Sequence, residues 1–343
     1  MKKKLIVLGL IVALVAIPLA ACAQEAPAPV PAPAPAPAPA EIIVWKAVQS
    51  QPLGMSDFKN WEEKFVAVVN EKAGGAFKID LLGGPEAIPI ENQAAALRDG
   101  VVQITAQYGN RIGAVAEPFT VWQNLDISLN ELKANGGFDW LKKEAEKSGL
   151  YWVGPMSEGT RANTFVFTSK AVTRPQELAG QSMATYGSIK PWVEALGMTY
   201  TNVVPTERYA AVERGVTDGA VVSLGSGAKF SIPEVAKYLL WPGAFSYHDL
   251  AFANLDAWNK LPDKYKQIIN ETADEVMAGA KMWREEIANI AIDTLKQQGV
   301  EIITFSDADT DWYIGQAYNA AWADTIQKYP AWGETLKGYI EKK

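Results

Sequence analysis

The residues best suited to catalysis or metal binding are scarce in this chain of 343 residues, which has one cysteine, Cys22, and one histidine, His248. A single cysteine excludes an intramolecular disulfide, and cysteine-based zinc or iron–sulfur sites need several thiolates. A single histidine leaves few ways to build a Ser-His-Asp triad or a histidine-rich metal site. We therefore expect no catalytic residue, no metal site and no cofactor, and the sequence favours a binding protein over an enzyme.

The charge balance of the chain argues against nucleic acid as a partner. There are 32 Lys and Arg residues against 39 Asp and Glu residues, a formal net charge of −7. Residues 1–21 carry three lysines and no acidic residue, so their removal lowers the net charge by three, to −10. A surface of this sign repels phosphate backbones and anionic lipid. We expect no nucleic-acid partner.

The N-terminus has the features of a lipoprotein signal peptide. Residues 2–4 are lysines, and residues 5–17 form an apolar segment that is too short for a good membrane span. The tetrapeptide LAAC at 19–22 follows and resembles a bacterial lipobox, in which the cysteine thiol carries the lipid. A secretory signal with an incidental cysteine is the alternative. We predict a signal peptide over 1–21, lipid attachment at Cys22, and a lipid-anchored, extracytoplasmic location in the periplasm or on the outer face of the cell membrane.

A linker of proline and alanine occupies residues 25–40. Alternating proline disfavours helix and sheet and favours extended polyproline II, which rises about 3.1 Å per residue. At that rise the linker reaches on the order of 50 Å. We expect residues 22–40 to be an acylated spacer outside the fold.

Strand and helix patterns alternate after the linker. We expect strands over 41–48, 77–82 and 101–106, and helices over 57–72 and 91–99. Glycines at 74, 75 and 100 supply the helix stops. Strand, helix and strand in alternation predict a parallel α/β sheet.

A second set of elements follows, with strands expected over 161–168, 182–185, 199–204 and 219–223 and helices over 190–196 and 207–214. Residues 250–254 look like a strand that crosses back, residues 263–299 like one long amphipathic helix, and residues 300–305 like a late strand. This order predicts two α/β lobes joined by a hinge, with 41–160 plus 250–280 in the first and 161–249 plus 281–343 in the second. Ligands of such sheets bind at the carboxyl ends of the strands, so we expect the site in a cleft between the lobes.

Several stretches then occur in a characteristic order: ENQAAALRDGVVQI (91–104), GTR (159–161), TSKAVTRPQELAGQSM (168–183), EALG (194–197), PTERYAAVERGVTDGA (205–220), EVAKYL (234–239) and WNKLP (258–262). Together they resemble the solute-binding proteins of tripartite ATP-independent periplasmic (TRAP) transporters, of the dicarboxylate-binding (DctP) family, from Glu41 to the C-terminus. The resemblance implies a two-lobed periplasmic-binding-protein-like (type II) fold with a hinge and a long helix spanning both lobes. It also implies TRAP membrane permease subunits as partners.

The sequence departs from the family at one substrate contact. In the family, the strand after a P-x-x-L-x-G turn usually ends in an arginine that pairs with the substrate carboxylate. Here the turn is at 175–180, and the arginine position falls on Ala184. The asparagine often found after the next D-G is also absent, since Val222 and Ser223 occupy that region. A buried arginine–carboxylate contact contributes roughly 1.5–3 kcal/mol, so its loss predicts a different class of ligand.

Two groups of candidate ligand contacts belong to segments that the family uses. Arg161 matches a second family arginine and is expected to hold an anionic group, with a hinge salt bridge to Glu158 as the alternative. Gln49 and Ser50 follow the first expected strand, where a family loop meets the ligand, with a solvated turn as the alternative.

Aromatic and amide side chains add further candidates. Tyr108 and Asn110 follow the third expected strand, where they would form a polar cleft wall. Trp122 is either a stacking surface for the ligand or core. Tyr186 follows Ala184 and is expected to fill the space left by the missing arginine, since tyrosine offers area and a hydroxyl without charge.

The remaining candidates are Ser223, Ser226 and Tyr247. Ser223 directly precedes the sequence LGSGAK (224–229), which contains Ser226. This sequence superficially resembles a phosphate-binding loop but lacks the G-x-x-x-x-G-K-[ST] spacing. His248 is interpreted as structural, because a lone histidine is more often a satisfied side chain than a ligand.

These features predict a receptor that closes about its hinge on a small organic acid, a monocarboxylate or an aromatic or amphipathic acid rather than a C4-dicarboxylate. A receptor for an ABC importer or a sensor kinase is the alternative, since it would share this architecture. An extracytoplasmic hydrolase is a third reading, and the single histidine argues against it.

Overall fold

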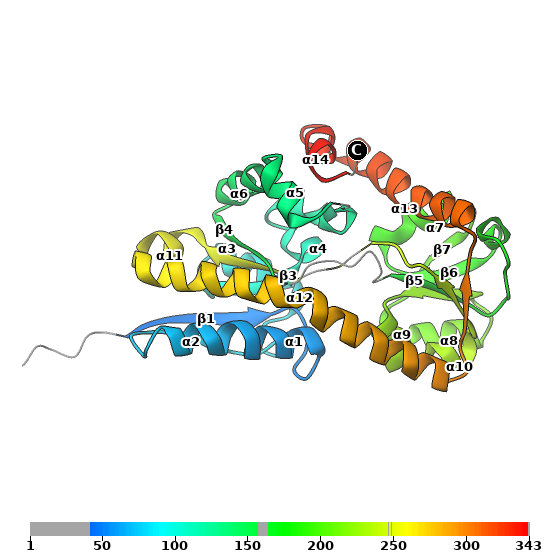
Figure 1. The fold of residues 1–343 in the computed structure, drawn as a ribbon, viewed down its shortest axis with the longest axis horizontal. Coiled ribbons are helices and arrows are strands. Elements are labelled where there is room, and N and C mark those ends of the chain that lie inside the picture. Colours follow the sequence, from blue (N-terminus) through cyan, green and yellow to red (C-terminus); the bar gives the residue numbers. More distant parts are fainter. Residues whose placement is uncertain (1–41, 126, 157–163, 246, 248, 342–343) are drawn as a thin grey trace, which may run out of the picture. The chain divides into compact units, whose positions relative to one another are not determined.

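Two β-sheets organise the computed structural model, which describes residues 42–341 apart from 126, 157–163, 246 and 248 (Figure 1). The side chains of residues 280–285 and 287 are likewise outside this description. Both sheets are covered by helices, so the fold is the two-lobed α/β type expected from the sequence. No helix in the described part of the chain has the length and apolar character needed to cross a membrane.

The first sheet has the strand order β2-β1-β3-β10-β4. Strand β1 pairs in parallel with β2 and β3, while β10 pairs antiparallel with β3 and β4. Strand β10 is thus the return strand that the sequence predicts, and its opposite direction makes the sheet mixed rather than wholly parallel. The strands are β1 (Ile43–Gln49), β2 (Phe77–Leu81), β3 (Ile104–Tyr108), β4 (Leu150–Pro155) and β10 (Asp249–Asn254).

Helices of the first lobe follow the sequence pattern closely. The helix expected over 57–72 is continuous, but its middle section, Trp61–Val66, has π-helical hydrogen bonding. Its ends are α1 (Ser56–Asn60) and α2 (Ala67–Lys72). The other helices of this lobe are α3 (Ile90–Arg98), α4 (Gly109–Ile112), α5 (Leu129–Ala134), α6 (Gly137–Lys147) and α11 (Leu255–Lys260), with a 3-10 segment at Glu117–Asn124.

The second sheet has the strand order β11-β9-β5-β8-β6-β7. Strands β7, β6 and β8 run in parallel, so their carboxyl ends meet at one edge. Strand β5 is antiparallel to both β8 and β9. The strands are β5 (Phe165–Thr168), β6 (Ser182–Thr185), β7 (Thr199–Asn202), β8 (Gly219–Val222), β9 (Tyr238–Trp241) and β11 (Glu301–Thr304), and the helices are α7 (Lys190–Ala195), α8 (Arg208–Glu213), α9 (Leu224–Lys229) and α10 (Ile232–Val235).

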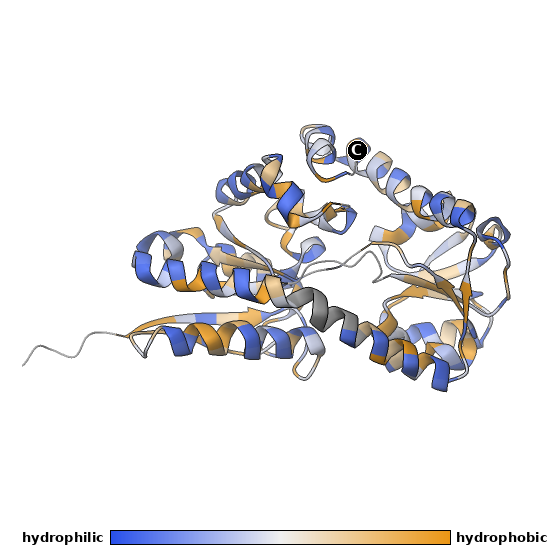
Figure 2. Cartoon of the chain, viewed as in Figure 1, coloured by the Kyte–Doolittle hydropathy of each residue, from blue (hydrophilic) through white to orange (hydrophobic). Residues whose placement is uncertain are grey.

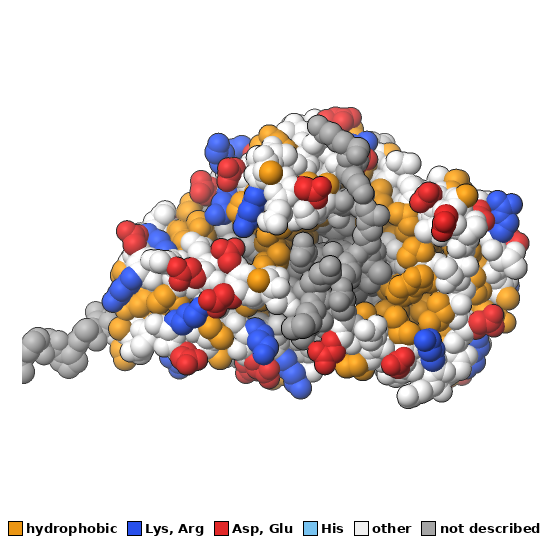
Figure 3. Space-filling model, viewed as in Figure 1, with side chains coloured by type: hydrophobic (Ala, Val, Ile, Leu, Met, Phe, Trp, Pro, Cys, Tyr) orange, Lys and Arg blue, Asp and Glu red, His pale blue; other side chains and the backbone are white. Residues whose placement is uncertain are grey.

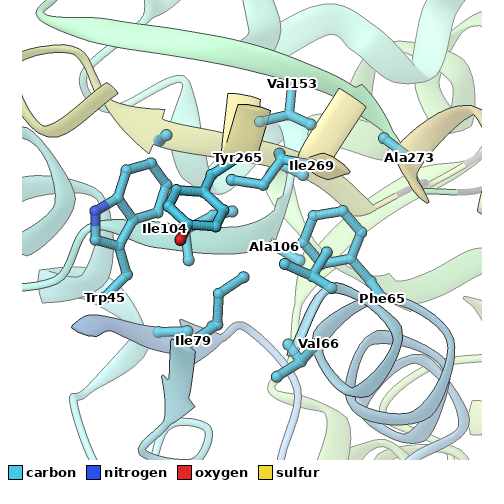
Figure 4. Packing of buried hydrophobic residues seen from close by; sticks show 14 of the residues in the cluster. Trp45, Phe65, Val66, Ile79, Ile104, Ala106, Val153, Tyr265, Ile269 and Ala273 are labelled. Atoms are coloured by element: carbon cyan, nitrogen blue, oxygen red, sulfur yellow. The ribbon is translucent and has the colours of Figure 1, made fainter. Parts of the chain in front are cut away.

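The long helix α12 (Asp263–Gln297) spans both lobes, as the sequence predicts. Its first half packs Tyr265, Ile269 and Ala273 into the core of the first lobe, at the spacing of one helix face (Figure 4). Its last turns contribute Ala291 and Leu295 to a cluster with strands of the second sheet.

The C-terminal helices also connect the two lobes. Helix α13 (Asp307–Lys328) packs Tyr313 and Ala317 in the second lobe, whereas its Trp322 lies in a cluster of the first lobe. Helix α14 (Gly333–Ile340) packs Leu336 in that same first-lobe cluster. We propose to count α14 with the first lobe.

Hydropathy is distributed as this packing requires. The strands are mostly hydrophobic, and the surface helices turn a hydrophilic face outward (Figure 2). Acidic and basic side chains are intermixed over the face in view in Figure 3.

Candidate functional site

A group of polar side chains meets at the carboxyl end of β1. Gln49 Nε2 donates to Asp249 Oδ2 at 2.7 Å, and Ser50 Oγ donates to Asp249 Oδ1 at 3.4 Å. All three residues are buried, and the carbonyl of Gln49 accepts from Gln93 Nε2 at 3.1 Å. The structure therefore brings Gln49 and Ser50 together, and it ties their side chains to the first residue of β10.

Tyr108, the last residue of β3, links this group to the second lobe. Its hydroxyl donates to Asp57 Oδ2 at 2.6 Å, which fixes the ring against helix α1. Its ring centroid lies 6.2 Å from that of Tyr247, a distance within the range of favourable aromatic pairs. Asn110, two residues further on, is half-buried, and no described residue donates a hydrogen bond to its buried Oδ1.

A second group of side chains lies beyond the carboxyl end of β6. Tyr186 follows this strand directly, and its ring packs edge to face on Tyr247 with centroids 6.0 Å apart. The hydroxyls of Tyr247 and Ser188 are 3.1 Å apart, within hydrogen-bond distance. Phe245, two residues before Tyr247, adopts a left-handed φ of 55°, and its ring is buried in the second-lobe core.

Burial keeps both tyrosines neutral over the physiological range. It raises the pKa of Tyr186, an effect that the positive charge of Arg208 partly offsets. It raises the pKa of Tyr247 well above the usual value for tyrosine, and the neighbouring Tyr186 adds to the rise. The exposed Arg111 of α4 acts in the opposite direction on both pKa values. Both hydroxyls are therefore neutral at physiological pH.

Arg208 is a buried residue of this group that was not among the residues expected from the sequence. It is the first residue of α8, and only 2% of its surface is exposed. Its Nε donates to the carbonyl of Val203 at 2.9 Å, and the guanidinium carbon lies 5.1 Å from the centre of the Tyr186 ring. Burial lowers the pKa of Arg208, and the surrounding tyrosines partly oppose this shift.

No local pattern in the sequence distinguishes Arg208 from a surface residue at a polar helix start. In the structure, Ala184, the expected arginine position, is fully buried in β6 and belongs to the same hydrophobic cluster as Val212 of α8. Helix α8 thus covers the sheet face on which Ala184 lies.

Ser223 and Ser226 lie at the carboxyl end of β8 and serve the helix that follows it. Ser223 is the N-cap of α9, and its Oγ accepts from the backbone N–H of Ser226 at 3.2 Å. The two hydroxyls are 3.0 Å apart, and both side chains are half-buried. The Ser223 hydroxyl is therefore occupied in capping, which satisfies a backbone donor at the helix start, and the Ser226 hydroxyl is hydrogen-bonded to it.

Trp122 was expected to be either a stacking surface for the ligand or a core residue, and the structure places it in the hydrophobic core. It is 3% exposed, and its ring packs on Phe119 and Trp152 with centroids 6.4 and 5.3 Å away. Because its surroundings are the aromatic cluster of the first lobe, we leave it out of the candidate site.

Arg161 and Cys22 lie outside the described residues, and so does His248. Within the described part of the chain, no group of three or more His, Cys, Asp or Glu side chains is arranged to hold a metal ion.

The chain belongs to the bacterial extracellular solute-binding protein family 7 (DctP), whose family model matches residues 50–328. It is thus a solute-binding protein of the TRAP transporter type, as the sequence motifs indicate. Members of this family are binding and transport receptors, and they act outside the cytoplasm.

Three relatives illustrate the range of the family. The C4-dicarboxylate-binding protein DctB of Bacillus subtilis is 23% identical over 261 residues, 72% of each chain. A monocarboxylate 2-oxoacid-binding periplasmic protein of Nostoc is 23% identical over 274 residues, 76% of this chain and 74% of the relative. A crystal structure is available of a Bordetella pertussis extracytoplasmic solute receptor binding pyroglutamic acid. Its superposition on this chain has a TM-score of 0.70 with 19% sequence identity and covers 87% of this chain and 99% of the receptor.

Proposed function

We propose that the protein captures a small organic acid between its two lobes and presents it to the membrane permease subunits of a TRAP transporter. The observation that carries this proposal is the contact between Tyr108 at the carboxyl end of β3 and Tyr247, which in turn packs on Tyr186 beyond β6. Side chains from both lobes meet there, at the strand ends where α/β sheets bind their ligands.

The favoured ligand is a monocarboxylate with an aromatic or amphipathic body. Ala184 replaces the arginine that pairs with a substrate carboxylate in related proteins, which removes one positive charge. Tyr186 and Tyr247 supply apolar ring faces and neutral hydroxyls instead. Relatives that bind 2-oxoacids and pyroglutamic acid support an acid with a single carboxylate, although another relative binds C4-dicarboxylates.

The mechanism is hinge closure without chemistry on the ligand. The ligand contacts both lobes, shifts the population to the closed form, and excludes water from the contacts that it makes. Helix α12, which packs in the cores of both lobes, is the element that accommodates the motion.

A panel of acids tests this function. Thermal unfolding is measured with pyruvate, pyroglutamate, benzoate, picolinate, succinate and malate, and X-ray scattering follows compaction. A ligand at one hundred times its Kd stabilises the folded state by about 2.7 kcal/mol, a rise in Tm of roughly 5 °C for a chain of this size. We expect such a rise, with compaction, for at least one monocarboxylate. A larger rise with succinate or malate contradicts the ligand class, and no compaction with any ligand contradicts the closure.

The lipid anchor is a separate part of the proposal. The LAAC sequence at 19–22 and the spacer after it support attachment through Cys22. One acylated cysteine carries more than one chain, as stable anchoring requires. Labelling of cells with an alkyne fatty acid is expected to mark the protein, and Cys22→Ser is expected to abolish the label and release the protein from the membrane fraction. An unlabelled wild-type protein would refute the anchor.

A further inference from the structure

Arg208 has no anionic partner among the described residues. Its Nη2 is buried, none of these residues accepts a hydrogen bond from it, and none of their carboxylates forms an ion pair with the guanidinium. Arginine carries five N–H donors, and the Nε–H is the one whose acceptor, the carbonyl of Val203, is identified among the described residues. The structure therefore holds a buried cation whose Nη2 donors no described residue uses.

A buried charge in this condition is costly to retain. Charged groups are seldom buried without a partner, because removing an ion from water strongly disfavours its charged form. The ring of Tyr186, 5.1 Å from the guanidinium carbon, repays part of this cost through a cation–π contact. A neutral side chain would hold α8 at lower cost, so the charge itself needs another explanation.

The position of Arg208 supplies that explanation. Its Nε is bound to the backbone just beyond β7, and its guanidinium faces the tyrosine just beyond β6, two strands that run in parallel. It thus lies at the sheet edge where ligands bind. Helix α8 covers the face of β6 on which Ala184 lies.

We infer that Arg208 binds the ligand carboxylate and replaces the arginine that is missing at position 184. This inference rests on the proposed function and specifies how the acid is recognised. The guanidinium pairs with one carboxylate, and the rings of Tyr186 and Tyr247 contact the body of the ligand.

The arrangement selects for a single carboxylate. The hydroxyl of Ser188 and the ring of Tyr108, both neutral, lie against Tyr247, and the other cation whose charge acts on both tyrosines is the exposed Arg111. Among the described residues, Arg208 is the one buried cation. A dicarboxylate therefore has a second anionic group for which the described residues offer no buried cation.

The test compares Arg208→Gln with the matched control Arg214→Gln, an exposed arginine six residues later on the same helical segment. Calorimetry measures the panel acid that the wild-type protein binds best, together with the amide of the same acid, such as picolinamide for picolinate. Loss of a charge-assisted contact weakens binding by roughly 10- to 100-fold. We expect that loss for the acid in Arg208→Gln, less than a threefold change for the amide, and no change for either in Arg214→Gln.

Two further variants keep the test independent of folding. Arg208→Lys retains the charge without the planar fork, so we expect it to bind the acid more weakly than wild type and more tightly than Arg208→Gln. A merely structural arginine would weaken acid and amide alike, and that result overturns the inference. So does undiminished acid binding by a folded Arg208→Gln, or a selective loss in Arg161→Ala that Arg208→Gln does not share.

Failure of the proposed function gives a different pattern. If the wild-type protein binds no acid of the panel, the organic-acid class is wrong and the assignment of Arg208 falls with it. If the wild-type protein binds an acid and Arg208→Gln binds it equally well, the function stands and only the inference fails.

Discussion

Asn254 gives a prediction whose magnitude follows from counted contacts. This residue ends β10 and is buried, with 8% of its surface exposed. Its Oδ1 accepts from the backbone N–H of Ala257 at 2.9 Å, which makes it the N-cap of α11. Its Nδ2 donates to the carbonyls of Leu97 and Arg98, at 3.0 and 2.9 Å, at the end of α3. One side chain therefore holds the termini of two helices on the strand that carries Asp249.

The substitution Asn254→Ala removes both functions. Loss of the N-cap costs about 1 kcal/mol, and each lost hydrogen bond to a carbonyl costs about 1 kcal/mol. The carbonyl of Leu97 keeps a second donor, the N–H of Gly100 at 3.1 Å, which reduces its share. We expect the free energy of unfolding to fall by about 2–3 kcal/mol in total.

The informative variant is Asn254→Asp. Aspartate is as good an N-cap as asparagine, so at an ordinary cap the stability would be retained. Here the carboxylate cannot donate, and it places a negative charge against two carbonyls at the C-terminal end of a helix, where the dipole disfavours it. We expect Asn254→Asp to lose as much stability as Asn254→Ala.

The assay is urea unfolding followed by tryptophan fluorescence, with m-values compared between variants. Asn202→Asp, at an exposed position at the end of β7, adds the same charge and is expected to change stability by less than about 0.5 kcal/mol. Recovery of more than half of the lost stability in Asn254→Asp would refute the reasoning, because the amide donations would then contribute little.

Two further predictions concern the second lobe. Asp218 accepts from Ser182 N–H at 2.8 Å and pairs with Lys170 at 2.7 Å, and these contacts lower its pKa. Because the pKa of Asp218 is lower in the folded state than in the unfolded state, its contacts stabilise the folded state at pH values above the unfolded-state pKa. This stabilisation is lost as the pH falls through the folded-state pKa. Asp218→Asn is therefore expected to unfold more readily than wild type at pH 7, and the difference should shrink below about pH 4, measured by urea titrations at both pH values. Trp192 is fully buried in the core beside α13, and Trp192→Ala is expected to lower the free energy of unfolding by about 3–5 kcal/mol. Lys190 is exposed, and Lys190→Ala is expected to leave the urea midpoint nearly unchanged.

The sequence predicted the fold well because its signals are local and repeated. The helix over 57–72 is marked by apolar spacing and by glycines at 74 and 75, and the structure confirms it as one continuous helix. The strand over 250–254 and its return to the first sheet are also confirmed. Strands β4 and β9 escaped prediction, since a short apolar run in a buried sheet does not differ from other core segments by pattern alone.

The candidate site was predicted less completely. Tyr186 lies next to Tyr247, whereas Gln49 and Ser50 donate hydrogen bonds to Asp249. The hydroxyl of Ser223 caps a helix and is hydrogen-bonded to that of Ser226. The role of each of these side chains depends on its hydrogen-bond partner in the folded chain. Partners up to 200 residues apart cannot be predicted from the local spacing of residues. Their roles toward a ligand stay predictions.

The sequence by itself determined the class of protein. Single cysteine and histidine residues, an acidic balance, alternating strand and helix patterns and an ordered series of motifs are properties of the chain that need no knowledge of packing. Only the tertiary structure placed the cation of Arg208 beside Tyr186. In the sequence, Arg208 resembles an ordinary surface residue at a polar helix start. It becomes notable because folding buries its guanidinium against Tyr186, with no carboxylate of the described residues paired to it. Burial and pairing depend on the whole fold, since desolvation is set by every element that packs around the charge.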